Sequence, residues 1–224
     1  MSEMFVKLWN SNLIQLAVWE TVYMTLISAF FSYLIGLPLG LILVATDKGG
    51  VHPIPWLNTV LGVIVNILRS IPFVILMVAF LPVAKFVVGT SLGNKAMIVM
   101  LIISAAPYVA RMVESSAREV GSGVIEAAQA MGTSGFKIVT KVILPEAKPS
   151  LLLGACISTV TILGYSAMAG TIGGTGLGQI AITYGYQRFN DDITWICCLL
   201  TVVIVQLIQI FGTKLATKTD KRIR

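Results

Sequence analysis

The sequence predicts an all-α integral membrane protein made of five membrane-spanning helices. Of its 224 residues, 56% are hydrophobic and only 12% are charged, and the mean hydropathy is +0.89. A water-soluble domain does not carry so few polar residues, because it needs them on its surface. The apolar residues also gather in runs that reach the roughly 20 helical residues needed to cross a bilayer. Together these observations predict one transmembrane domain over residues 1–224.

Five apolar runs are candidate spans, and they cover 14–46, 57–83, 93–113, 149–170 and 193–213. The first run is much longer than the core of a signal peptide and no small-residue cleavage site follows it, so we expect it to be retained. Pro38 in the first span and Pro72 in the second are expected to kink their helices or to free backbone carbonyls, which neighbouring helices can satisfy.

Lysine and arginine set the predicted orientation, because the cytoplasmic loops of membrane proteins are enriched in them. An odd number of spans places the two termini on opposite sides. With the C-terminus in the cytoplasm, that side holds Lys48, Arg111, Arg118, Lys137, Lys141, Lys148, Lys214, Lys218, Lys221, Arg222 and Arg224. The outer side then holds only Lys7, Lys85, Lys95 and Arg188. The asymmetry predicts an outer N-terminus and a cytoplasmic C-terminus.

The formal charge of +6 does not indicate a nucleic-acid partner, because the basic residues lie at the edges of apolar runs. Cys156, Cys197 and Cys198 lie inside such runs, where thiols act as small hydrophobic groups. They predict neither disulfides nor a metal site. No internal repeat is visible, and five spans without inverted halves make a poor complete pathway. We therefore expect at least two copies of the chain around a shared axis.

A compact charged segment over 121–145 separates two of the apolar runs and contains the stretch EAAQAMGTSGFKIVTKVILP. Ser122 is expected to cap a short helix that runs from Gly123 to about Met131. Gly132 then stands where the end of a helix favours a left-handed residue. The segment is thus predicted to begin with a helix and a tight turn.

A second short helix is expected to follow, capped by Ser134 and ended by Pro145.

In the first helix, Val124, Ala128 and Met131 recur at helical spacing and predict a narrow apolar stripe. The small alanine side chains beside it suit a helix that inserts into a cleft of another protein.

Residue types alone leave two interpretations of this segment open. One is a helix pair that docks on a partner protein. The other is an amphipathic helix pair lying on the lipid surface, where Lys137 and Lys141 would meet anionic headgroups.

The segment resembles the cytoplasmic loop signature of permease subunits of binding-protein-dependent ABC importers, which reads E-A-A, three residues, G, nine residues, I-x-L-P. The matching residues are Glu126, Ala127, Ala128, Gly132, Leu144 and Pro145, with Val142 in the isoleucine position. The resemblance implies that these residues couple the membrane domain to ATPase subunits and that Glu126 reaches a basic group of the ATPase. The alternative for Glu126 is a solvated acid favoured by the helix dipole.

Three further stretches extend the resemblance over nearly the whole chain, namely NILRSIPFVILMVAFLP, AAPYVARMVE and GYSAMAGTIGGTGLGQIAITYGY. They are similar to the five-span permeases of methionine ABC importers. This resemblance implies the ABC importer permease fold and a homodimer in a bacterial inner membrane that translocates methionine, in its L and D forms. It also implies an extracytoplasmic binding lipoprotein and two cytoplasmic ATPase subunits, which bind ATP and Mg, so that this chain carries no cofactor.

Candidate contacts of the transported substrate lie in two stretches. The first contains Asn66, Arg69 and Ser70. A charge within a span is costly and marks function by default, so Arg69 is a candidate partner for a substrate carboxylate. Alternatively, Arg69 snorkels to the cytoplasmic interface or bonds backbone carbonyls near a bend at Pro72.

The second stretch places Tyr165, Ser166 and Met168 among small residues, which allow close packing or line a cavity. Apolar, polarizable walls would suit a thioether substrate. Ordinary helix packing explains the same residues equally well.

The remaining motifs indicate no enzyme. The stretch GGTGLG lacks the GxGxxG spacing and follows no strand, so it is predicted to be an outer loop or gate. Asp191 and Asp192 would contact a binding protein or simply be solvated. His52 has no carboxylate or cysteine partner nearby in the sequence. No Walker-type phosphate loop is present, so the chain is not expected to hydrolyse ATP.

Three alternatives to a methionine ABC permease are open. A secondary transporter would need intramembrane acids for ion coupling, and Glu20, near the outer interface, is the only candidate. An intramembrane enzyme would need a nucleophile with a base, or metal ligands, within the spans. A permease for another small amino acid or a related analogue is the nearer alternative.

Overall fold

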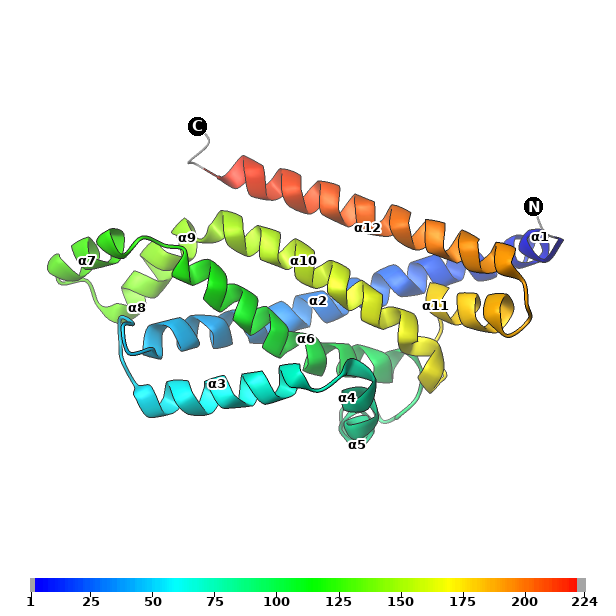
Figure 1. Ribbon diagram of the computed structural model, residues 1–224, viewed down its shortest axis with the longest axis horizontal. Helices are drawn as coiled ribbons and strands as arrows, with labels where there is room; N and C mark the ends of the chain where they lie inside the picture. Colours follow the sequence, from blue (N-terminus) through cyan, green and yellow to red (C-terminus); the bar gives the residue numbers. More distant parts are fainter. Residues whose placement is uncertain (1–2, 221–224) are drawn as a thin grey trace. The chain divides into compact units, whose positions relative to one another are not determined.

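The computed structural model describes residues 3–220 (Figure 1). These residues form helices joined by short turns, and none of them lies in a β-strand. The predicted all-α fold is therefore confirmed for the part of the chain that is described. Lys221, Arg222 and Arg224, which were counted in the cytoplasmic charge, lie outside it.

The helices follow one another with few residues between them. The first six are α1 Glu3–Asn10, α2 Leu13–Thr46, α3 Pro55–Ser70, α4 Phe73–Ala79, α5 Leu81–Val88 and α6 Gly93–Arg118. The next four are α7 Ser122–Ala130, α8 Gly135–Ile138, the π-helix η1 Val139–Ile143 and α9 Leu144–Glu146. The last five are α10 Lys148–Ser166, the 3₁₀-helix η2 Ala167–Ile172, α11 Leu177–Ile180, the π-helix η3 Ala181–Tyr186 and α12 Asp191–Thr219.

Four helical stretches are long and apolar enough to cross a membrane, and they are Leu13–Thr46, Gly93–Arg118, Lys148–Ile172 and Asp191–Thr219. A fifth crossing arises if α3 and α4 together count as one span. The helix α2 runs on through Pro38 without a break. The chain is thus a multi-pass helical protein with four or five crossings.

The span predicted over 57–83 is not one helix. The chain bends by 106° between α3 and α4. Pro72 supplies the reason, because it has no N–H to donate and it disfavours the helical conformation of the residue before it. Ile71 accordingly has φ −82° and ψ 125°, an extended conformation, and α3 ends at Ser70. Pro72 was expected to kink a continuous helix, and it instead separates two.

The chain divides into two compact units. The first consists of the described parts of Met1–Phe30, Pro72–Ser104 and Thr159–Gln209. The second consists of the described parts of Phe31–Ile71, Ala105–Ser158 and Ile210–Arg224. Four long helices contribute residues to both units, and they are α2, α6, α10 and α12.

The second unit is built around close packing of α2 on α6. Gly36 and Gly40 lie one turn apart on α2, and a Cβ atom added to either would come within 2.7 Å of an atom of Val109 or Val113. Two glycines four residues apart let helices approach closely. Val109 and Val113 continue into a buried cluster that also contains Ala128 of α7. The segment 121–145 is therefore anchored in the same core as the long helices of this unit.

The first unit has a core where α1, α2, α11 and α12 meet. Its buried residues are Leu8, Ile14, Ala17, Leu177, Ile180, Ile193 and Cys197. The three cysteines are free thiols, and Cys198 is exposed while the other two are buried.

Candidate functional site

The segment that carries the permease-like motif forms the helix, turn and helix that its residues predicted. α7 ends in a tight turn at Gly132, whose φ of 72° is the left-handed conformation that glycine adopts without strain. The amide of Gly132 donates to the carbonyl of Gln129 at 2.8 Å, and the amide of Thr133 donates to the carbonyl of Ala128 at 3.1 Å. This pair of bonds is a Schellman motif, which satisfies the last carbonyls of a helix.

The capping prediction was wrong for Ser122, whereas Ser134 does occupy the predicted N-cap position. Gly121 occupies the N-cap position of α7 and Ser122 is the first helical residue. Ser134 does precede α8 in an extended conformation, but neither helix has a side-chain bond at its cap. No serine hydroxyl therefore stabilises the start of either helix.

Pro145 does not end the second helix, contrary to its predicted role. The helical path widens into η1 just before it and continues through α9, with Pro145 in the first turn of α9. A proline is tolerated in the first turn of a helix, where its missing N–H has no partner to lose.

The face of α7 that packs inward differs from the predicted stripe. Ala128 is buried and Ile125 is packed against the same cluster, whereas Val124 is 50% exposed and Met131 is 78% exposed. Phe136 at the start of α8 is 79% exposed. A single helix can bury only one face, and the long-range partners of α7 select Ile125 and Ala128. Val124, Met131 and Phe136 are therefore left as apolar groups on the outside of the segment.

The motif residues divide between the two faces. Ala128 and Leu144 pack on the buried cluster, while Glu126, Ala127 and Pro145 are exposed. Glu126 and Ala127 are therefore accessible to a partner.

A buried ionic network, which residue patterns did not reveal, joins α6 to its neighbours just before α7. Its centre is Glu114, which is only 8% exposed. Arg111 Nη1 and Arg118 Nη2 both donate to the carboxylate, the second at 2.9 Å. Arg111, Glu114 and Arg118 stand at i, i+3 and i+7 of one helix, and this spacing was the only signal available in the sequence.

Each arginine of this network also reaches beyond α6. Arg111 Nη2 donates to the carbonyl of Gly62 at 3.1 Å and to Oδ1 of Asn66 at 2.9 Å, both on α3. Arg118 Nη2 lies 2.8 Å from Oδ2 of Asp47, which follows α2. Glu114 thereby orients two arginines that tie α6 to α3 and to the end of α2.

Asp47 lies outside the spans and its charge is stabilised there. Arg118 donates to its carboxylate, and the backbone N–H of Lys48 donates to Oδ1 at 2.8 Å. These bonds favour the ionised form and hold the pKa of Asp47 below its usual range. Asp47 is therefore an anion at neutral pH.

The first stretch of candidate substrate contacts lies on the exposed side of α3. Asn66, Arg69 and Ser70 are all exposed, and Arg69 is in the last turn of the helix. The Ser70 hydroxyl donates to the carbonyl of Asn66 at 2.7 Å, and Oδ1 of Asn66 is taken by Arg111. The amide group of Asn66 and the guanidinium of Arg69 are the groups left to meet a ligand.

The second stretch lies at the end of α10, in the other compact unit. Tyr165 stacks on Phe73 with ring centroids 4.7 Å apart and an interplanar angle of 4°. Ser166 is buried and its hydroxyl donates to the carbonyl of Leu163 at 2.7 Å. Met168 is partly exposed in η2. Tyr165 and Met168 thus present apolar, polarizable surface, while Ser166 is committed to its own helix.

The glycine-rich loop after η2 is held at both sides by polar side chains. Asn94 Nδ2 donates to Oγ1 of Thr175, and the amide of Thr175 donates to Oδ1 of Asn94, both at 2.7 Å. The amide of Leu177 donates to the buried Oγ1 of Thr21 at 2.9 Å. The loop is therefore fixed to the start of α6 and to α2.

Asp191 and Asp192 begin α12 and are exposed, where acids are favoured by the helix dipole. Nearby, the guanidinium of Arg188 lies over the ring of Tyr184, 4.5 Å from its centroid. Within residues 3–220, no three histidine, cysteine, aspartate or glutamate side chains are grouped to hold a metal ion.

The apolar spans, the bent α3–α4 pair and the exposed motif helix together define a membrane permease. Residues 36–224 match the family model described as the binding-protein-dependent transport system inner membrane component, and the chain belongs to this family. Members of this family are membrane components of transport systems and not enzymes.

Similar proteins lie within the same family. The methionine import system permease protein MetP of Bacillus subtilis is 44% identical over 216 residues, covering 96% of this chain and 95% of its own length. The D-methionine transport system permease protein MetI of Escherichia coli K12 is 49% identical over 153 residues, covering 68% of this chain and 70% of its own. A chain from the inward-facing MetNI methionine ABC transporter superposes with a TM-score of 0.92 at 44% identity, covering 99% of this chain and all of its own.

Proposed function

We propose that the chain is the membrane-spanning permease of a bacterial ABC importer for methionine, in its L and D forms. Two copies would form the pathway, with two ATPase subunits at the cytoplasmic segment and a binding lipoprotein on the opposite side. The similarity to methionine permeases over nearly the full chain supports the substrate. A permease for another small amino acid or analogue is the alternative.

The cytoplasmic position of 121–145 and of the C-terminus, in the membrane of a bacterial cell, rests on the distribution of lysine and arginine. In this orientation α7 faces the ATPase subunits. ATP and Mg would be held by those subunits, and this chain supplies no cofactor site to the proposal.

The exposed side of α7 and the turn after it would form the docking surface. Glu126 is placed to meet a basic group of the ATPase, and Ala127 allows close approach beside it. Gly132 permits the turn, while Ala128 and Leu144 set the position of the segment on the buried cluster. Apolar Val124 and Met131 would be covered on docking.

The Glu114 network is the observation that carries the coupling proposal. A force applied to α7 reaches α6 through the few residues between them, and α6 is tied to α3 by Arg111 and to the end of α2 by Arg118. Several hydrogen-bonded ion pairs around one buried carboxylate hold a defined geometry. Motion of the docked helix would therefore move three long helices together, as a two-state change of the bundle requires.

Each stretch of candidate residues would line its own part of the substrate pathway, within its own compact unit. Arg69 and Asn66 would recognise the carboxylate, while the Ser70 hydroxyl is bonded to the backbone carbonyl of Asn66 in the last turn of α3. Tyr165 and Met168 would contact the thioether, and Ser166 would shape the helix beside them. Met168→Leu and Arg69→Gln should each raise the KM for methionine uptake without lowering expression. Unchanged kinetics in both variants would exclude these contacts.

The decisive experiment is uptake of labelled methionine into vesicles that contain this chain, the matching ATPase subunits and the binding protein. We expect uptake that requires ATP and all three components. Uptake that persists without the ATPase subunits would instead indicate a secondary transporter.

Glu126→Lys tests the docking surface. The reversed charge would repel the basic group of the ATPase, so uptake should be lost while insertion and expression are unchanged. Glu119→Lys is the matched control, because Glu119 is an exposed acid just before α7 and outside the motif. Wild-type transport by the Glu126→Lys variant would refute the role of this residue.

A further inference from the structure

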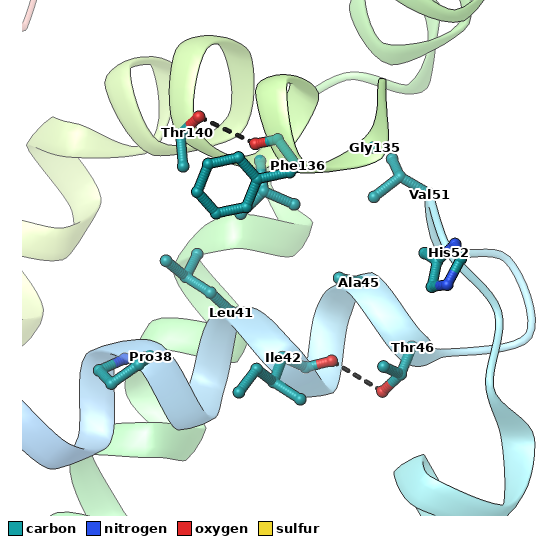
Figure 2. Close-up of a pocket in the computed structure, with 11 residues that line it drawn as sticks. Pro38, Leu41, Ile42, Ala45, Thr46, Val51, His52, Gly135, Phe136 and Thr140 are labelled. Carbon is teal, nitrogen blue, oxygen red and sulfur yellow. Dashed lines mark hydrogen bonds between the residues drawn. The ribbon is translucent and has the colours of Figure 1, made fainter. Parts of the chain in front are cut away.

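A pocket of about 550 Å³ lies between the last turns of α2 and the second helix of the cytoplasmic segment. This volume is within the range of about 300–1,000 Å³ that is typical of small-molecule sites. Its walls come from α2 between Pro38 and Thr46, from the loop at Val51 and His52, and from residues 135–140 (Figure 2). All these residues belong to the second compact unit.

The polar groups in the walls are almost all committed elsewhere. The hydroxyl of Thr46 donates to the carbonyl of Ile42 and that of Thr140 donates to the carbonyl of Phe136, at 2.7 and 2.8 Å (Figure 2). Only the imidazole of His52 is left as a polar side chain in the walls. An amino-acid zwitterion would lose hydration of both charges here without compensation. The occupant must therefore be apolar.

One wall of the pocket belongs to a helix that would lie in the hydrocarbon of a membrane. Pro38, Leu41 and Ile42 lie in the last turns of a helix long and apolar enough to cross the membrane. Figure 2 shows Phe136 above Leu41, so the aromatic ring forms the opposite wall. Each methylene placed between these apolar walls is removed from water, which is favourable.

The charges next to the pocket select the headgroup. Lys137 and Lys141 each follow a wall residue in the sequence, Phe136 and Thr140, so both lysines belong to the segment that forms this wall. Lys48 follows the α2 wall, and all three lysines are exposed. Asp47 is the only acid in residues 38–52 and 135–141, and its charge is balanced by Arg118. The segments that form the pocket therefore carry exposed basic residues, which favour an anionic headgroup.

From these observations we infer that the pocket is a binding site for an anionic phospholipid, with an acyl chain between α2 and Phe136 and the headgroup beside Lys137 and Lys141. The site is separate from the exposed face of α7 and does not depend on the proposed transport function. It would seat the cytoplasmic segment at the membrane surface.

Photocrosslinking in nanodiscs tests the site on the full-length chain. The probes are phosphatidylglycerol and phosphatidylcholine that carry a diazirine at the end of one acyl chain, and mass spectrometry locates the adducts. We expect saturable phosphatidylglycerol adducts within residues 38–52 and 135–140. Ala45→Phe fills the pocket and should lower this labelling about tenfold. The exposed Ala79, which is not a wall residue, gives the matched control Ala79→Phe.

Two more variants separate the headgroup from the chain. Lys137→Gln and Lys141→Gln should each raise the half-saturating probe fraction about fivefold, the effect of one basic residue near an anionic surface. Lys95→Gln, far from this segment in sequence, should change nothing. Phe136→Ala removes an exposed wall without loss of core packing, so it tests the site even if Ala45→Phe does not fold.

The outcomes that overturn the inference are distinct. If the amount of labelling is unchanged in both the Ala45→Phe and the Phe136→Ala variants, the pocket is not the site. Equal labelling by the two lipids would exclude selection of an anionic headgroup. Adducts that move onto added ATPase subunits would show that a protein fills the pocket.

Discussion

Arg118 Nη2 lies 2.8 Å from Oδ2 of Asp47 and 2.9 Å from Oε1 of the buried Glu114. The two acids lie in different parts of the chain, one after α2 and one within α6, so the guanidinium fixes the end of one long helix to another. The relationship places a balanced set of charges just before the segment 121–145.

Glu114→Gln should destabilise the protein by about 2 kcal/mol, because it leaves the two arginines with one acid fewer in a partly buried site. Thermal unfolding of the purified protein in detergent measures this loss. In vesicles the same variant should keep ATP hydrolysis and lose uptake, since the link from α7 to α3 is weakened. Glu119→Gln is the control for a nearby exposed acid. A Glu114→Gln protein as stable as the wild type would contradict the network.

Asp47 gives a prediction for pH dependence. Its pKa is lowered in the folded protein by Arg118 and by the amide of Lys48, so the folded state binds the proton less well than the unfolded state. The stabilising contribution is complete above the unfolded value of about 3.9, and it is lost as the pH falls through the folded pKa. The difference in unfolding free energy between wild type and Asp47→Asn should be constant from neutral pH to about pH 5 and shrink in more acidic buffer. A difference that grows on acidification would be inconsistent with this pair.

Gly132→Ala should cost about 1 kcal/mol of stability through backbone strain alone. The φ of 72° is unfavourable for alanine, while an added Cβ would meet no atom within 4 Å. Gly123→Ala is the matched control, because it also meets nothing within 4 Å but lies within α7, where alanine is favoured by about 0.5 kcal/mol. Opposite signs for the two variants in thermal unfolding are expected. A loss of stability in both would point to a contact that alanine disrupts.

Gly40→Ala should cost about 2 kcal/mol, because an added Cβ would lie 2.5 Å from the carbonyl oxygen of Ala110 and force the helices apart. Gly62→Ala tests the effect of helix propensity alone, since its nearest atom is Arg111 Nη2 at 3.6 Å. Chemical denaturation in detergent compares the two. Equal tolerance of both substitutions would show that α2 and α6 do not pack this closely.

Several features of the candidate site follow from local sequence. The turn at Gly132 was predictable because only nearby atoms decide whether a residue can adopt a positive φ. The end of α3 near Pro72 was indicated by the same kind of local restriction, although the 106° bend was not. The motif positions from Glu126 to Pro145 were identified by resemblance, because a single helix pattern does not distinguish a docking helix from one on a lipid surface.

Other features depended on which distant residues meet. The choice of Ile125 and Ala128 as the buried face of α7 depends on α6 and η1, and the periodic pattern of α7 allowed a different face. Glu114 is one acid among several until Arg111, Arg118 and Asp47 are brought to it, and the pocket beside Phe136 exists only where α2 and α8 come together.

By itself, the sequence determined the class of the protein, its apolar helices, the distribution of its charges and the motif with its glycine turn. These properties depend on composition and on interactions between residues a few positions apart. The tertiary structure alone decided the direction of the chain after Ile71, the partners of Glu114 and the walls of the apolar pocket. These features require contacts between segments far apart in the chain, and the local propensities of the residues do not determine which segments meet.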